Sequence, residues 1–116
     1  MSDQYSLYIA LRDLMVRAAP AMKIGKDVVG ECTINVPTAT MASKDPLWFG
    51  TVRLTGQRVS VYLPTLAMKE GRDIPVPETL KNRAQTKTCF VFSDVEADAF
   101  ADLENVTRAA AQAFAA

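Results

Sequence analysis

Apolar residues along the chain follow two periods, one typical of helices and one typical of strands. Near the N-terminus they have the spacing of one helical face, at Leu7, Leu11, Leu14 and Ala18. Ser2 is a suitable N-cap, so we expect a helix that begins there and ends or bends at Pro20. From Val28 to Val36 the period changes to two, which predicts a strand with one buried side.

Residues 47–64 alternate twice around a glycine, which predicts a β-hairpin. A turn at Gly56 and Gln57 gives glycine the first turn position, whereas a turn one residue earlier would set Arg53 opposite Arg58, and opposed like charges destabilise a strand pair. We therefore expect the later turn. The cross-strand pairs that follow are Leu54 with Val59, Val52 with Val61, and Arg53 with Ser60.

The last third of the chain predicts two helices and one strand. Irregular structure over 65–78 is expected to lead into a short helix over 78–85 and a strand over 87–92. Ser93 and Glu96 form a capping box, which predicts the start of the final helix. Its inner face is expected at Ala99, Leu103, Val106, Ala110 and Phe114.

This order of elements predicts a single α+β domain that spans residues 1–116. The economical architecture is a two-layer α/β sandwich, in which a mostly antiparallel sheet is covered on one face by the N- and C-terminal helices. A chain of 116 residues is long enough to bury one core.

Composition narrows the class of protein. Thirteen Lys and Arg residues balance thirteen Asp and Glu residues, which removes the positive charge that nucleic-acid binding needs. A content of 49% hydrophobic and 22% charged residues is ordinary for a globular protein, and no apolar run is long enough to span a membrane. The first residues do not resemble a signal peptide, so we expect a cytoplasmic protein with Cys32 and Cys89 reduced.

Two blocks of the sequence, LWFGTVRLTGQRVSVYL and LKNRAQTKTCFVF, have a distinctive joint pattern that continues through the C-terminal helix. In these blocks the chain resembles the YdhG-like family of small bacterial proteins. The resemblance implies a frataxin-like α/β sandwich and an uncharacterised binding or chaperone module. It also implies frataxin-like carriage of iron or another divalent cation as a function to consider, with no cofactor required.

The basic stretch before the last strand is a candidate anion site. Its candidate ligand-binding residues are Lys81, Arg83, Gln85 and Lys87. Such groups bind carboxylate or phosphate through charge-assisted hydrogen bonds. The alternative is that these cations only offset the negative end of a helix dipole and cover apolar surface.

Asp94, Asp98 and Asp102 recur every four residues and are the candidate metal ligands. On one helical face they would form a line of hard oxygen donors, which is where the resemblance would place iron. The alternative is a solvated helix face, because acidic residues are favoured in a first helical turn by the dipole alone.

The outer face of the hairpin is the third candidate site. Phe49, Arg53 and Tyr62 are expected there, and aromatic residues on a polar sheet face predict a contact with a partner or with a second copy in a homodimer. The alternative is that residues 65–78 pack over them. Gly50 is expected at a bulge or at a close approach of the backbone.

Catalysis is not expected. The sequence contains no histidine, the usual base that activates cysteine or serine. The two-sided apolar pattern around Cys89 predicts a buried thiol in a central strand, although nearby cations would activate it if it were accessible. We expect a non-enzymatic binding module, with metal carriage, self-association through the hairpin face and anion binding as alternatives.

Overall fold

The computed structural model of the chain describes residues 4–36, 47–67 and 73–113. Six strands form one open antiparallel sheet in the order β1-β2-β3-β4-β6-β5. The helices are α1 (Gln4–Ala18), α2 (Glu78–Lys81) and α3 (Ala97–Gln112), with a 3-10 turn η2 at Pro64–Ala67. The strands are β1 (Lys23–Val28), β2 (Glu31–Val36), β3 (Leu47–Thr55), β4 (Arg58–Tyr62), β5 (Ala84–Thr86) and β6 (Cys89–Phe92).

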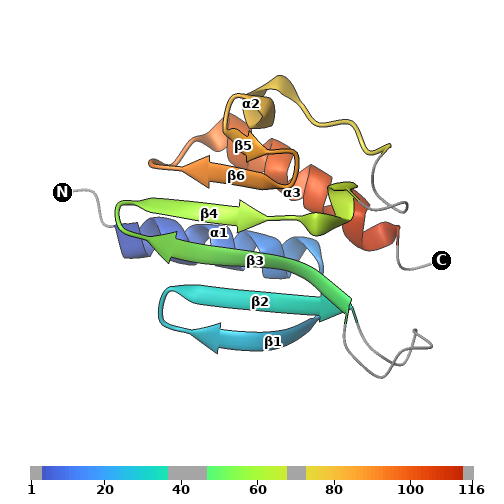
Figure 1. Cartoon of the computed structure of the whole chain (residues 1–116), viewed down its shortest axis with the longest axis horizontal. Coiled ribbons are helices and arrows are strands. Elements are labelled where there is room, and N and C mark those ends of the chain that lie inside the picture. Colours follow the sequence, from blue (N-terminus) through green and yellow to red (C-terminus); the bar gives the residue numbers. More distant parts are fainter. Residues whose placement is uncertain (1–3, 37–46, 68–72, 114–116) are drawn as a thin grey trace.

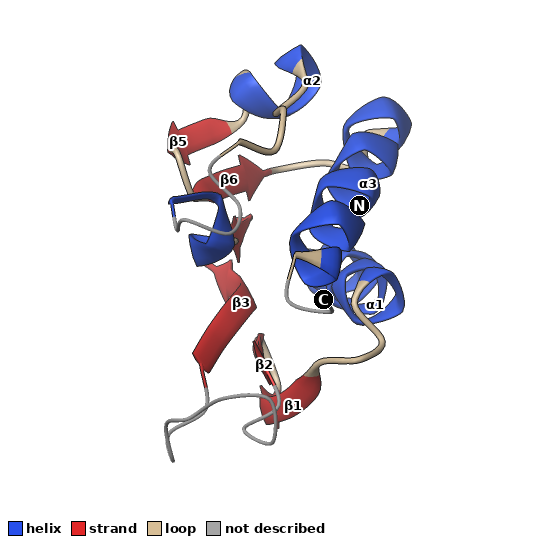
Figure 2. Cartoon of the chain, turned by 90° about the vertical axis from the view of Figure 1, so that its right-hand side faces the viewer, coloured by secondary structure: helices blue, strands red, loops and turns tan. Residues whose placement is uncertain are grey.

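Helices α1 and α3 lie together on one face of the sheet (Figures 1 and 2). The α+β class and the antiparallel sheet are therefore confirmed. Arg17 of α1 donates from Nη2 to Oε1 of Glu104 of α3 over 2.7 Å, and Arg108 also donates to Glu104. No helix within the described ranges is long and apolar enough to cross a bilayer.

The helical ladder at the N-terminus is confirmed. Leu7, Leu11, Leu14 and Ala18 are all buried in the layer between α1 and the sheet. The predicted cap, Ser2, lies outside the described residues.

The single strand predicted over 28–36 is wrong, because this segment contains a hairpin turn. Gly30 has a φ of +84°, a left-handed conformation that glycine adopts without strain, and the chain reverses there between β1 and β2. The predicted inward positions hold within β2, where Cys32, Ile34 and Val36 are buried. All six residues of β1 are exposed, so this edge strand has no apolar alternation that could have revealed it.

The register predicted for the second hairpin is confirmed. Leu54 pairs with Val59, and Arg53 pairs with Ser60. Gly56 has a φ of +61°, as the first position of a tight hairpin turn requires.

A β-bulge interrupts β3 near its start. Ile34 of β2 pairs with Gly50 and Asn35 pairs with Trp48, so Phe49 is the extra residue. The prediction that Phe49 lies on the outer face is wrong, because the bulge turns its side chain into the core, where it is 0% exposed. The close approach predicted at Gly50 is confirmed, since an added Cβ would lie 2.8 Å from the carbonyl oxygen of Tyr62.

The helix predicted over 78–85 is only half right. It ends at Lys81, and Ala84–Thr86 form the short edge strand β5 instead. The backbone N–H of Val91 donates to the carbonyl oxygen of Arg83 over 2.9 Å, so pairing with β6 takes over where the helix stops.

The buried stripe predicted for the final helix is confirmed, but the predicted capping box is wrong. Ala99, Leu103, Val106 and Ala110 are buried, and Phe114 lies outside the described residues. The helix begins at Ala97 with Glu96 as N-cap and no side-chain capping bond, so Ser93 and Glu96 do not form a capping box.

Candidate functional site

The face of the sheet opposite α1 and α3 carries a hydroxyl and aromatic cluster, which we call the open face cluster: Thr33, Trp48, Thr51 and Tyr62. The indole Nε1 of Trp48 donates to Oγ1 of Thr51 over 2.8 Å. That oxygen also lies 2.9 Å from Oγ1 of Thr33. The rings of Trp48 and Tyr62 are in contact, with centroids 6.3 Å apart.

Of the three residues predicted to bind a partner, Arg53 and Tyr62 lie on this face. Arg53 is exposed and makes no ion pair with any residue that the structure describes. Trp48 takes the place predicted for Phe49, because the bulge exchanges the faces of these neighbours. No sequence signal marks such a bulge beyond the adjacent Gly50.

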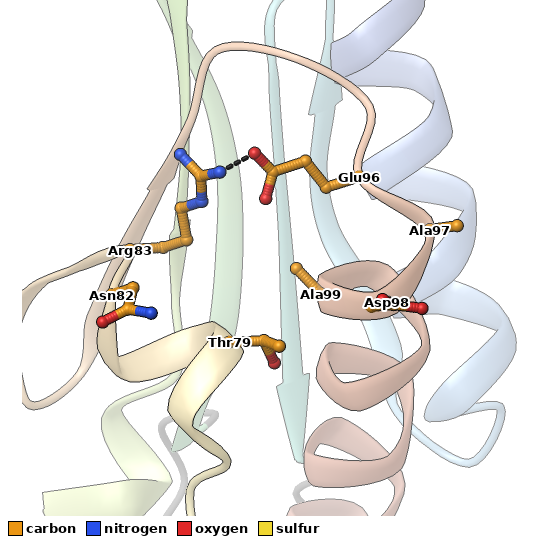
Figure 3. A pocket seen from close by; sticks show the side chains of 7 residues that line it. All are labelled: Thr79, Asn82, Arg83, Glu96, Ala97, Asp98 and Ala99. Atoms are coloured by element: carbon orange, nitrogen blue, oxygen red, sulfur yellow. Dashed lines mark ion pairs between the residues drawn. The ribbon is translucent and has the colours of Figure 1, made fainter.

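A polar cleft lies between α2 and the start of α3 (Figure 3). Its volume is about 440 Å³, and it is lined by Thr79, Asn82, Arg83, Glu96, Ala97, Asp98 and Ala99. Arg83 and Glu96 point toward one another and form an ion pair. Both side chains are about one-third exposed, at 33% and 37%, so the pair adds little to stability and mainly orients the guanidinium.

A second cleft, which we call the arginine cleft, shares Asn82 and Arg83 with the first. Its volume is about 280 Å³, and Arg58, Gln85 and Ser93 also line it. Two of the four predicted anion ligands, Arg83 and Gln85, line this cleft, and their role as ligands stays a prediction. Lys81 and Lys87 are exposed and line neither cleft, and Arg58, which the sequence did not single out, enters from the β3–β4 hairpin.

The three candidate metal ligands do not share one helical face, because Asp94 precedes the first residue of α3. Asp98 lines the α2–α3 cleft, while Oδ2 of Asp102 accepts a hydrogen bond of 2.5 Å from Thr79. Within the described ranges, no group of three or more His, Cys, Asp and Glu residues is arranged to hold a metal ion. Metal binding at these aspartates stays a prediction.

Both cysteines are buried free thiols in the structure. Burial raises the pKa of Cys89, and a hydrogen bond with Tyr62 offsets that rise only in part. Burial and the nearby Asp27 raise the pKa of Cys32. Thiolate chemistry needs an accessible group with a lowered pKa, so neither residue has the properties of a nucleophile.

A third hollow lies between α1 and the β1–β2 turn, and Tyr8, Arg12 and Asp27 are among its lining residues. Arg12 Nε donates to Asp27 over 3.0 Å, and this bond lowers the pKa of the Asp27 carboxyl. The hydroxyl of Tyr8 donates to the carbonyl oxygen of Val28 over 3.3 Å. Arg12 and Asp27 are thus bonded to each other, and the Tyr8 hydroxyl is bonded to the backbone.

Comparisons with protein-family models, with curated proteins and with solved structures find no match to this chain. The resemblance to the YdhG-like family stays a prediction.

Proposed function

We propose that the chain is a non-catalytic interaction module whose open sheet face docks a second copy of the same chain. Trp48 carries this proposal. Its side chain is 44% exposed although its only hydrogen-bond donor is already bonded to Thr51. The accessible part of the ring is therefore apolar, and a partner would remove it from water without leaving an unpaired polar group.

The residue types around Trp48 support an interface between proteins. Trp, Tyr and Arg are enriched among the residues that dominate binding energy, and the open face offers Trp48, Tyr62 and Arg53. The hydrogen bond to Thr51 and the contact with Tyr62 fix the indole before any partner arrives. A side chain that is already ordered loses less entropy on binding.

The charges on this face support a second copy as the occupant. Glu31 of β2 and Arg53 of β3 are direct neighbours in the strand register, and Oε2 of Glu31 also lies 3.4 Å from Nζ of Lys26 in the same chain. A two-fold axis parallel to the strands and midway between β2 and β3 would set Glu31 of each copy against Arg53 of the other. The same axis would set Trp48 of each copy against Asn35 of the other, because Asn35 is the register partner of Trp48.

Fluorescence tests this proposal directly, because Trp48 is the one tryptophan of the chain. At about 0.1 mM a dimer with a Kd near 10 µM would be the main species. We expect sedimentation at twice the chain mass there, and a red shift of Trp48 emission on dilution as the ring returns to water.

A matched pair of variants distinguishes a specific interface on the open face from non-specific association of exposed apolar side chains. Trp48→Ala should sediment as a monomer. Val95→Ala, which removes an apolar side chain that is 67% exposed in the segment before α3, should stay dimeric. A wild type that is monomeric at about 0.1 mM, or equal loss of the dimer in both variants, would contradict the proposal.

A further inference from the structure

The arginine cleft brings together groups that are far apart in the sequence. Arg58 comes from the start of β4, while Asn82 and Arg83 come from the junction of α2 and β5. Ser93 lies directly after β6. The cleft is therefore created by the pairing of β4, β6 and β5, and it does not involve the open face cluster.

The cleft is built from donors of hydrogen bonds and positive charge. Its lining contains two arginines and no acidic residue. Arg58 makes no ion pair with any other residue in the described ranges. Arg83 uses Nη2 toward Glu96, and a guanidinium has five N–H donors, so several donors of Arg83 remain for the cleft.

The backbone around the cleft is held in place. The N–H of Arg83 donates to the carbonyl oxygen of Leu80 over 2.9 Å, and its carbonyl oxygen accepts from Val91 over 2.9 Å. Gln4 of α1 donates through Nε2 to the carbonyl oxygens of Gln57 and Ser93, which ties the β3–β4 turn to the end of β6. Both arginines thus extend from anchored positions.

We propose that the arginine cleft binds a small dianion, either a phosphate group or a dicarboxylate. Arg58 and Arg83 place two guanidinium groups in the lining, and Glu96, which pairs with Arg83, lies outside it. Arg binds phosphate and carboxylate through paired N–H donors. The neutral donors Asn82, Gln85 and Ser93 would complete the set. A volume of about 280 Å³ is below that of most drug-sized sites, which indicates a compact ligand.

The test is calorimetric titration of the full chain with inorganic phosphate, succinate and acetate at constant ionic strength and mildly alkaline pH. We expect saturable binding of phosphate or succinate with one site per chain, and much weaker binding of the singly charged acetate. Arg58→Gln should weaken dianion binding about tenfold or more, as loss of a charge-assisted bond implies. Arg58 is exposed and has no ion partner among the described residues, so this variant should fold normally.

Lys81→Gln and Lys87→Gln are the matched controls, because each removes one positive charge from the same stretch of sequence without touching the lining of the cleft. Both should bind within about twofold of the wild type, since exposed charges act weakly through salt solution. Arg83→Lys keeps the charge but loses the paired donors, and should also weaken binding.

Binding of phosphate alone or of succinate alone would support the site and name its ligand class. Equal losses of dianion affinity in Arg58→Gln, Lys81→Gln and Lys87→Gln would show that binding depends only on the overall positive charge, and would overturn the proposal. The absence of saturable binding of both phosphate and succinate would also overturn it. Dimerisation through the open face is measured separately, so either proposal can fail alone.

Discussion

The indole nitrogen of Trp48 donates to the hydroxyl of Thr51 over 2.8 Å, although the two residues are three positions apart on the same strand. In a regular strand such residues point to opposite faces of the sheet. The bulge at Phe49 reverses the alternation, so that Trp48 and Thr51 share the outer face and Phe49 fills the core. One extra residue thus creates the exposed aromatic surface.

Thr51→Val should loosen this surface. Thr51 is almost fully buried, and its Oγ1 links Trp48 to Thr33. Loss of the shared acceptor should lower the free energy of unfolding by about 1–2 kcal/mol, measured by urea denaturation, and should weaken the dimer. Thr55→Val, at an exposed position of the same strand, should stay within about 0.5 kcal/mol. Equal stability of the two variants would show that the linked hydroxyls contribute nothing.

Gly50→Ala should destabilise the junction of β3, β4 and α1. A new Cβ would lie 2.8 Å from the carbonyl oxygen of Tyr62 and 3.2 Å from Cε of Met15. The Met15 side chain can move away at little cost, whereas the backbone oxygen of Tyr62 cannot. We therefore expect the free energy of unfolding, measured by urea denaturation, to fall by about 1–3 kcal/mol. Met15→Ala in the same chain should not restore the loss. A neutral Gly50→Ala would show that the strands separate more easily than this contact indicates.

Thr107→Val should stabilise the chain. Thr107 is 0% exposed on α3, and its hydroxyl has no hydrogen-bond partner among the residues that the structure describes. Valine has nearly the same shape without the unsatisfied polar atom, so the free energy of unfolding should rise by about 1 kcal/mol or more. Thr79→Val should do the opposite, because its hydroxyl donates to Asp102. A rise in Tm for the first and a fall for the second is the expected result.

Tyr8 should make the fold sensitive to alkali. Burial raises the pKa of Tyr8 to about 12. Because this value exceeds the unfolded value of about 10, the stabilisation is fully present below pH 10 and is lost as pH rises through about 12. The free energy of unfolding should therefore fall by about 2–3 kcal/mol more in the wild type than in Tyr8→Phe over that range. Parallel pH profiles for the two chains would contradict this account.

The parts of the fold that follow from local rules could be predicted from the sequence. The register of the β3–β4 hairpin follows from charge opposition and turn chemistry, and the buried stripe of α3 follows from helical spacing. Strand β1 could not be predicted because all of its residues are exposed, and β5 because three residues carry no period. Gly50 indicated a bulge or a close approach at this point of β3, but the reversal of Phe49 into the core depends on the pairing with β2.

The residues of the arginine cleft likewise include some that the local sequence predicts and one that only the tertiary fold brings in. Arg83 and Gln85 were predicted from a contiguous basic stretch, and both line the arginine cleft. Arg58 reaches that cleft only because β4 pairs with β6, whose register partners run from Val59 with Phe92 to Tyr62 with Cys89, far apart in the sequence. Lys81 and Lys87 belong to the same basic stretch, but their side chains are exposed and do not line the cleft.

The most direct test of docking between two copies is a charge exchange on the open face, followed by sedimentation at about 0.1 mM. Arg53→Glu should give a monomer, because each copy would then set Glu31 against a second carboxylate. Adding Glu31→Arg restores opposite charges across the two-fold axis and should restore the dimer. A dimer that survives Arg53→Glu, or a double variant that stays monomeric while folded, would contradict the proposed arrangement.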